Sequence, residues 1–294
     1  MCRISHHEQS ARQRSPSSTI TLLCVNAGKE ITEMSPFNDA DYSKRSGDPE
    51  RGLRKGDAGV TVSIGVLAGM GPRSTAPFID MLVTECQLGY GAKYDLDFPK
   101  MHIISLPTPF WPGRDIDDHA MVTALQEGIA DLVKARVSLI AVPCNLAHCY
   151  FAEMKKACGD IPLLHIAESA LASLPAEASR IAVLATEPTL EAGFYQARIK
   201  ASGREMIDSQ RLREMTTALI GQVKAKGFHD AEVQAGWKAL VAEVERLEAE
   251  ALLIACTDLS PLIKDHSYRF TIADTAATLS RATIQTFRLL SGYR

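Results

Sequence analysis

The chain has 294 residues, of which 46% are hydrophobic, and a formal net charge of -3. This length supports one large domain or two of ordinary size, and the balanced charge argues against a nucleic-acid-binding protein, which usually carries a basic surplus. No window approaches the roughly 18 uninterrupted apolar residues of a membrane span. The early apolar run at 20–25 is shorter than the ~7–15 residues of a signal-peptide core, so we expect a cytoplasmic protein.

The sequence holds seven cysteines, and no two of them have the C-x-x-C spacing of a zinc ribbon. In a reducing cytosol most of these cysteines are free thiols. We therefore expect no metal site, and the question becomes which thiols pack in a core and which do chemistry.

Residues 1–58 differ from the rest of the chain because they hold polar runs, such as 43–49, and show no hydrophobic periodicity. A segment of this kind cannot bury enough apolar surface to build a core. We expect a disordered or extended N-terminal segment, with a functional tail as the alternative.

The folded part is expected to begin near Val60 with a short buried strand at 62–67, rich in β-branched residues, that ends in the turn Gly69-Met70-Gly71-Pro72. A helix follows, with Ser74 as its N-cap. Apolar residues at strand and helix spacing then predict a strand at 101–106, an amphipathic helix at 118–135 and a strand at 138–142.

The second half of the chain repeats landmarks of the first half in the same order. Residues 180–185 repeat 63–68, and residues 251–257 repeat 139–145. Strands that alternate with helices indicate parallel sheets. We therefore predict an α/β fold of two pseudo-symmetric, doubly wound domains, each with a parallel sheet flanked by helices, and an active site in the cleft between them.

The predicted boundaries place the first domain at 59–170 and the second at 171–274, with a C-terminal helix at 275–294 that packs back onto the first domain. Glu168 and Asp274 occupy matching positions in the repeat. We expect both carboxylates at strand ends, where they would order the cysteine loops through backbone N–H groups.

Two cysteines stand at corresponding places in the repeat, Cys144 and Cys256, each just past a predicted strand. Ligands of open α/β sheets bind beyond the carboxyl ends of the strands. Each cysteine precedes a residue that can cap a helix, Asn145 or Thr257. The positive end of a helix dipole lowers the pKa of a thiol from about 8.5, so we expect thiolate character. The alternative is that both are small buried packing residues, a common role of free cysteine.

Two thiols on opposite sides of one cleft suit racemisation at a Cα atom. That reaction needs a base on one face of the carbon and an acid on the other. No pyridoxal phosphate fingerprint stands out in the sequence, so we expect no cofactor.

On these residues the sequence resembles the aspartate racemase branch of the Asp/Glu/hydantoin racemase family. The resemblance covers roughly residues 61–290, and its motifs are residues 64–72, 143–148 and 255–259. The Gly-Met-Gly-Pro turn favours this branch over glutamate racemase, whose opening contains Asp-Ser-Gly. The resemblance implies a cofactor-independent racemase of aspartate or a related acidic amino acid, with Cys144 and Cys256 as the catalytic pair.

We expect the substrate-binding set to comprise Gly69, Met70, Gly71, Arg114, Asn145, Thr186, Lys224 and Thr257, with Ser74, His148 and Asp258 as supporting residues. By resemblance, Arg114 grips the side-chain carboxylate of the substrate and Lys224 contributes to the same end of the site. Charge supports this role independently, since arginine binds carboxylates bidentately. The alternatives are a solvated loop arginine and an exposed helix lysine. His148 lies one helical turn after Cys144, where it could tune the thiol, touch the substrate or simply stand in the cap region.

Two departures from the family pattern bear on the identity of the substrate. Leu146 stands where the family usually has threonine, and Asp258 stands where it usually has glutamate. The competing functions are a maleate isomerase-like enzyme, a decarboxylase, a racemase for a different substrate, and a non-catalytic amino-acid-binding protein. We expect an amino acid as the partner, no nucleic acid or membrane, and a homodimer as the assembly.

Overall fold

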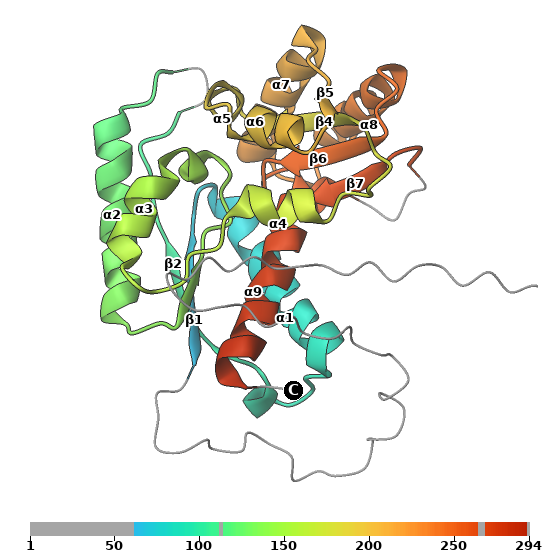
Figure 1. Ribbon diagram of the computed structural model, residues 1–294. Helices are drawn as coiled ribbons and strands as arrows, with labels where there is room; N and C mark the ends of the chain where they lie inside the picture. The colour runs from blue at the N-terminus through green and yellow to red at the C-terminus, as the bar shows by residue number, and fades with distance from the viewer. Residues whose placement is uncertain (1–61, 112–113, 264–267, 293–294) are drawn as a thin grey trace, which may run out of the picture. The chain divides into compact units, whose positions relative to one another are not determined.

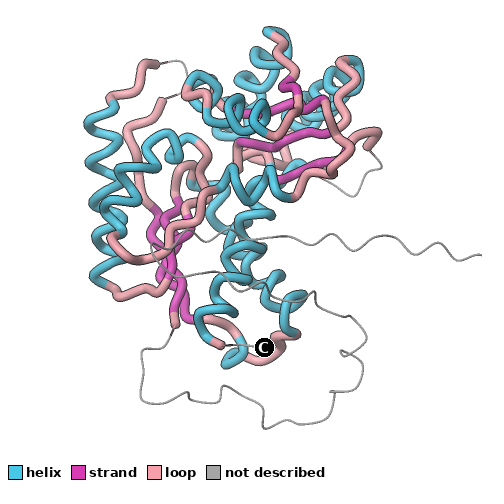
Figure 2. Tube along the Cα trace, in the orientation of Figure 1, coloured by secondary structure: helices cyan, strands magenta, loops and turns pink. Residues whose placement is uncertain are grey.

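Two parallel β-sheets, each covered by helices on both faces, make up the part of the chain that the computed structural model describes (Figures 1 and 2). The described residues are 62–111, 114–263 and 268–292, so the predicted N-terminal segment 1–58 lies outside them. Among the described residues no helix is long and apolar enough to cross a membrane.

The strands of the described residues are β1 (Ser63–Ala68), β2 (Lys100–Ser105), β3 (Leu139–Ala141), β4 (Arg180–Ala185), β5 (Glu205–Met206), β6 (Ala251–Ala255) and β7 (Thr271–Asp274). The α-helices are α1 (Thr75–Tyr90), α2 (Asp118–Lys134), α3 (Phe151–Cys158), α4 (Ile166–Ala172), α5 (Glu187–Glu191), α6 (Phe194–Ala201), α7 (Gln210–Lys226), α8 (Ala231–Arg246) and α9 (Thr275–Ser291). Short 3-10 helices lie at η2 (Pro72–Ser74), η3 (Asp95–Asp97), η4 (Leu146–Tyr150) and η5 (Ser260–Leu262).

The first sheet has the strand order β2-β1-β3 and the second has β5-β4-β6-β7, with every pairing parallel. Strands β1, β3 and β6 are buried along their whole length, as expected for parallel strands covered on both faces. Their side chains alternate between two cores. In β3, for example, Leu139 joins one core while Ile140 joins the core on the opposite face.

Each sheet is therefore the middle layer of a sandwich of helices. Helices α2 and α3 supply the core on one face of the first sheet, and α1 and α9 supply the core on the other. Helices α7 and α8 cover one face of the second sheet, while α4 and α6 contribute to its other face. The predicted doubly wound α/β class, built as two similar halves, is confirmed.

The C-terminal helix α9 packs against α1 and α4, and its Leu279 and Phe287 enter the core of the first sheet. Helix α9 and strand β1, which lie at opposite ends of the described residues, therefore contribute to the same core. The domain limits at 59–170 and 171–274 stay a prediction.

Most of the expected elements lie within a residue of their observed bounds. The helix expected at 118–135 spans Asp118–Lys134, and the strand expected at 62–67 spans Ser63–Ala68. The expectation for Glu168 was wrong. Glu168 lies in the first turn of α4, where its exposed carboxylate pairs with Arg198, because the chain already turns into a helix after His165.

Candidate active site

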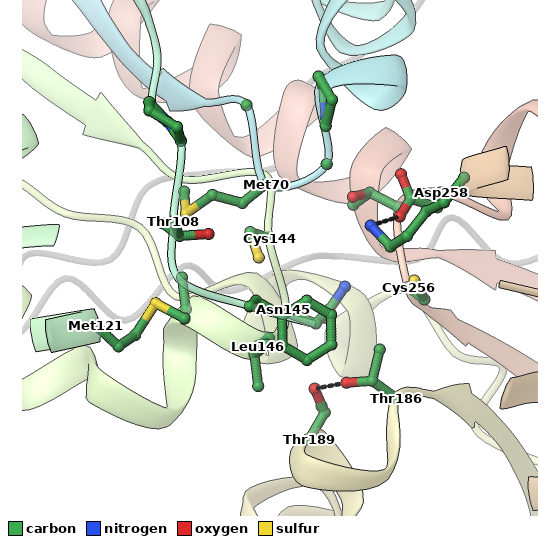
Figure 3. Close-up of a pocket in the computed structure, with 18 of the residues that line it drawn as sticks. Met70, Thr108, Met121, Cys144, Asn145, Leu146, Thr186, Thr189, Cys256 and Asp258 are labelled. Atoms are coloured by element: carbon green, nitrogen blue, oxygen red, sulfur yellow. Dashed lines mark hydrogen bonds and ion pairs between the residues drawn. The ribbon is translucent and has the colours of Figure 1, made fainter. Parts of the chain in front are cut away.

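The two cysteine motifs meet at one cavity of about 440 Å³ (Figure 3). Cys144 follows β3 and Cys256 follows β6, and both thiols line the cavity although each residue is only 7% or 8% exposed. The carboxyl end of one strand in each sheet, β3 in the first and β6 in the second, therefore supplies one thiol. Of the remaining expected residues, those that line the cavity are Gly69, Met70, Gly71, Asn145, Thr186, Lys224, Thr257 and Asp258.

The Gly-Met-Gly turn after β1 passes close to the segment that follows β2. Gly69 has a φ of +94°, and a Cβ atom there would lie 2.4 Å from the backbone nitrogen of Leu106. Only glycine fits such a position. Ser74 closes the same turn by donating a hydrogen bond of 2.8 Å to the Gly71 carbonyl, so it supports the turn without lining the cavity.

Asn145 is held by a buried hydrogen-bond network. Its Oδ1 accepts from the Tyr195 hydroxyl at 2.5 Å, and its Nδ2 donates to Thr275 Oγ1 at 3.0 Å. The Thr275 hydroxyl in turn donates to the carbonyl of Ile254, two residues before Cys256. Asn145 is therefore a positioning residue with one amide hydrogen left for a ligand.

His148 bonds to the backbone of the Cys144 turn on the side away from the cavity. Its Nε2 accepts a hydrogen bond from the Ile166 amide at 3.2 Å, so Nδ1 carries the proton and donates to the Cys144 carbonyl at 2.8 Å. Burial lowers the pKa of His148 to about 4, which keeps the ring neutral. The ring does not line the cavity, so His148 acts on the turn rather than on a bound substrate.

The expected low pKa of the thiols is wrong for this pocket. Burial raises the pKa of Cys144 to about 11, although the backbone amides of Ala147 and Leu146 act in the opposite direction. Burial and the neighbouring Asp258 carboxylate raise the pKa of Cys256 further. The amides at the start of η4 do stabilise a thiolate, as a helix N-terminus should, but the loss of hydration is the larger effect.

Lys224 and Arg114, the two cations expected to bind the side chain of the substrate, are placed differently from that expectation. Lys224 Nζ lies 2.6 Å from Asp258 Oδ2, so this cation is already paired within the cavity. Arg114 is exposed and stands over the ring of Trp111, with Cζ 6.0 Å from the ring centroid. It is not among the residues that line the cavity, and both Arg114 and Trp111 are exposed.

Sequence reasoning missed a wall of the cavity formed by Pro107, Thr108, Phe110 and Met121. The first three follow the carboxyl end of β2, next to β1 in the first sheet. Their position after a strand was a usable signal, since that edge of an α/β sheet carries the ligand site. Thr189, whose hydroxyl lies 2.8 Å from that of Thr186, also lines the cavity and carried no such signal.

A doubly wound α/β fold with paired thiols at the carboxyl ends of two sheets defines a class, the cofactor-independent amino-acid racemases. The sequence pattern of the Asp/Glu/hydantoin racemase family matches residues 67–283. The chain is 39% identical, over 224 residues, to the broad specificity amino-acid racemase RacX of Bacillus subtilis strain 168, covering 76% of this chain and 97% of that protein. The chain therefore belongs to the Asp/Glu/hydantoin racemase family and is an isomerase, a racemase.

Solved structures share the fold. The aspartate racemase of Picrophilus torridus matches with a TM-score of 0.66 at 22% identity, over 76% of this chain and 94% of that one. A glutamate racemase of Francisella tularensis in complex with D-glutamate matches with a TM-score of 0.54 at 14% identity, over 79% and 82%. These likenesses support the two-sheet architecture.

Proposed function

We propose that the protein racemises a free amino acid at its α-carbon, with Cys144 and Cys256 exchanging the roles of base and acid. The observation that carries this proposal is the presence of both thiols in one cavity, each supplied by a different sheet. The 39% identical relative is described as an amino-acid racemase, which supports the same reaction.

The proton balance closes with the two thiols alone. The thiolate of one cysteine removes the Cα proton and becomes a thiol, and the electron pair stays on the substrate as a carbanion delocalised into the α-carboxylate. The thiol of the other cysteine then donates a proton to the opposite face and becomes a thiolate. The reverse reaction uses the same groups in exchanged roles, so no further reactant is consumed.

The two-thiol mechanism requires that one thiol be ionised before the reaction begins. The pKa of Cys144 is raised less than that of Cys256, so Cys144 is the more readily ionised of the two. Lys224 lowers the pKa of both thiols and Asp258 raises both. The two members of the ion pair therefore have opposite effects on the pKa of each thiol.

Backbone and side-chain donors near the thiols suit the common part of any amino acid. The turn Gly69–Gly71, Asn145 and Thr257 line the cavity beside the cysteines. The Gly69 N–H is already bonded to Thr75 Oγ1 at 3.1 Å. The other N–H groups of this set are suited to a carboxylate that gains charge as the proton leaves. The acidic side chain expected from the sequence depends on Arg114 and Lys224, and neither presents a free cation to the cavity.

The test is incubation of the purified protein with a panel of L- and D-amino acids in D2O. Loss of the Cα proton is followed by NMR and inversion by chiral chromatography. Cys144→Ser and Cys256→Ser should each abolish racemisation, because a serine hydroxyl supplies almost no anion at neutral pH. Cys158→Ser is the matched control, since Cys158 is a buried thiol at the end of α3 that does not line the cavity.

Elimination from a single enantiomer distinguishes the roles of the two thiols. Each single variant keeps one thiol, so it should eliminate chloride from one enantiomer of β-chloroalanine, and the two variants should prefer opposite enantiomers. Racemisation at the wild-type rate by either single variant would refute the two-thiol mechanism. Inversion without Cα exchange would contradict proton delivery by a second thiol, whereas decarboxylation of the substrate would favour the competing decarboxylase. The homodimer stays a prediction, to be tested by light scattering.

A further inference from the structure

The cavity holds two charged side chains among the described residues that line it, and they neutralise one another. Lys224 from the last turn of α7 and Asp258 from the loop after β6 form an ion pair of 2.6 Å. The Asp258 side chain is only 4% exposed. The charge offered to a substrate by these two side chains therefore sums to zero.

The surrounding chain is shaped to fit this pair. A Cβ atom on Gly71 would lie 2.9 Å from Lys224 Nζ and 3.0 Å from Asp258 Oδ1, so the missing side chain leaves room for both groups. The ring of Phe110 stands 5.9 Å from Nζ and shields it. Burial lowers the pKa of Lys224, but the Asp258 carboxylate outweighs it and raises the pKa above its usual value. Gly71, Phe110 and Asp258, from three different segments, therefore surround the charged Lys224 amine.

The carboxylate oxygen of Asp258 that is not bonded to Lys224 cannot bind a carboxylate of the substrate. Asp258 Oδ1 is buried and has no hydrogen-bond partner among the described residues. A carboxylate oxygen can only accept, so a carboxylate of the substrate bound near Asp258 would add a second negative charge that this buried oxygen cannot compensate.

The part of the cavity on the side of Cys144 is lined mainly by apolar side chains. Met70, Met121 and Leu146 lie there together with Thr108, and Figure 3 shows them away from Asp258 and Cys256. Apolar walls gain from burying methylene and methyl groups. They offer nothing to a charged side-chain terminus that has lost its water.

We propose that the Lys224–Asp258 pair makes the enzyme a racemase for amino acids whose side chains carry no carboxylate, with the side-chain stem lying against Met121 and Leu146. This inference rests on the proposed function. A dicarboxylic substrate would have to share the cation with Asp258, or displace a buried carboxylate from its partner and leave it unpaired, which is costly.

The first test is the ranking of wild-type kcat/KM for Cα exchange in D2O. Alanine, leucine, methionine and lysine are compared with aspartate and glutamate. We expect the acidic pair to be slower by tenfold or more. A wild-type preference for aspartate or glutamate overturns the inference while the proposed function stands. Absence of exchange with every amino acid refutes the proposed function and the inference with it.

The second test frees the lysine. Asp258→Asn keeps the shape of the side chain and removes its charge, so the ratio of kcat/KM for aspartate over alanine should rise roughly 10- to 100-fold, the value of one charge-assisted hydrogen bond. Using a ratio cancels effects on the thiols that both substrates share. Glu243→Gln is the matched control, because Glu243 is a buried carboxylate paired with Arg246 on α8, outside the cavity. An unchanged ratio in Asp258→Asn overturns the inference.

A double variant covers the case in which Asp258→Asn does not fold. Lys224→Gln with Asp258→Asn removes both charges and leaves no unpaired ion. Its aspartate-to-alanine ratio should stay within about threefold of the wild type, because the sum of the two charges is unchanged. A tenfold fall in that ratio would mean that Lys224 serves acidic substrates in the wild type, and would overturn the inference.

Discussion

The hydroxyl of Thr257 donates a hydrogen bond of 3.0 Å to the carbonyl oxygen of Pro143. Thr257 follows Cys256 and Pro143 precedes Cys144, so one buried bond joins the two cysteine turns. The Asn145 amide and the Thr275 hydroxyl make a second connection, from the first turn to the carbonyl of Ile254 before the other. The separation of the thiols is therefore set by contacts between the turns themselves.

Thr257→Val should test this connection, because valine keeps the shape of threonine and loses the hydroxyl. The Pro143 carbonyl would then be buried without this donor, at a cost of about 1–2 kcal/mol in the free energy of unfolding. We expect kcat to fall about 10-fold or more in both directions, since a small displacement of one thiol misaligns it for either enantiomer. Thermal unfolding and chiral chromatography measure the two effects.

The control for this variant is Thr286→Val. Thr286 is a buried threonine of α9 whose hydroxyl bonds to the Ala282 carbonyl within the helix, far along the chain from either cysteine turn. It should show at most a small change in stability, because the Ala282 carbonyl keeps its backbone bond within the helix, and no loss of kcat. Equal loss of kcat in both variants would show that the Thr257 bond has no particular positioning role.

Arg114→Ala should have little effect on the choice of substrate. Arg114 is exposed, stacks on Trp111 and does not line the cavity. We expect kcat/KM for aspartate and for alanine to change by less than about threefold each, in line with the small energies of exposed charges. A selective loss of activity toward aspartate would show instead that Arg114 binds the side-chain carboxylate of the substrate, as the family resemblance implies.

Asp274→Asn should stabilise the protein at neutral pH. Asp274 caps α9 by accepting from the Ala276 amide and also accepts from the Ser260 hydroxyl, and burial raises its pKa to about 6. The raised pKa means that the fold favours the protonated form, so its contribution to stability is present below about pH 4 and is lost as the pH rises through 6. Asparagine caps equally well and has no such loss.

The expected gain is about 1–2 kcal/mol at pH 7.5 and about half of that at pH 5, measured by urea unfolding at both values. Asp117→Asn is the matched control, since Asp117 caps α2 from an exposed position. A gain for Asp274→Asn that is equal at the two pH values would mean that the ionisation of this carboxyl is not its source.

The fold was predictable because its signals are local. Strands buried on both faces read as continuous apolar runs, and the repeat of 139–145 at 251–257 is enough to place both cysteines directly after strands. The prediction that Glu168 ends a strand was wrong for a related reason. Its repeat partner Asp274 ends a strand, whereas the chain before Glu168 makes only the isolated bridge between Leu163 and Ile140.

The electrostatics of the site were not predictable from local signals. Lys224 and Asp258 belong to different elements, and their pairing depends on how α7 meets the loop after β6 and on the space beside Gly71. The thiol pKa values depend on burial by the whole cavity wall, whereas the effect of a helix terminus depends only on the residues next to each cysteine. Sequence patterns therefore identified which groups gather, while their charge depends on contacts between distant parts of the chain.

The raised thiol pKa values predict how alkylation depends on pH. The thiolate is the reactive form, so the iodoacetamide rate of a free thiol levels off above a pKa of about 8.5. Because the pKa of Cys144 is about 11, its rate should still climb between pH 8 and pH 10, by close to tenfold per unit. Cys256 should lag behind it. Peptide mass spectrometry after timed quenching gives the rate at each residue.

Asp258→Asn supplies the decisive comparison in the same experiment. Asp258 raises the pKa of both thiols and is a larger contributor for Cys256, so its neutralisation should move both profiles to lower pH and move that of Cys256 more. Cys158 serves as an internal control, since burial raises its pKa to about 11 without any contribution from Asp258. Profiles that level off by pH 8.5, or that shift to higher pH in the variant, would contradict the assignment of neutral, buried thiols.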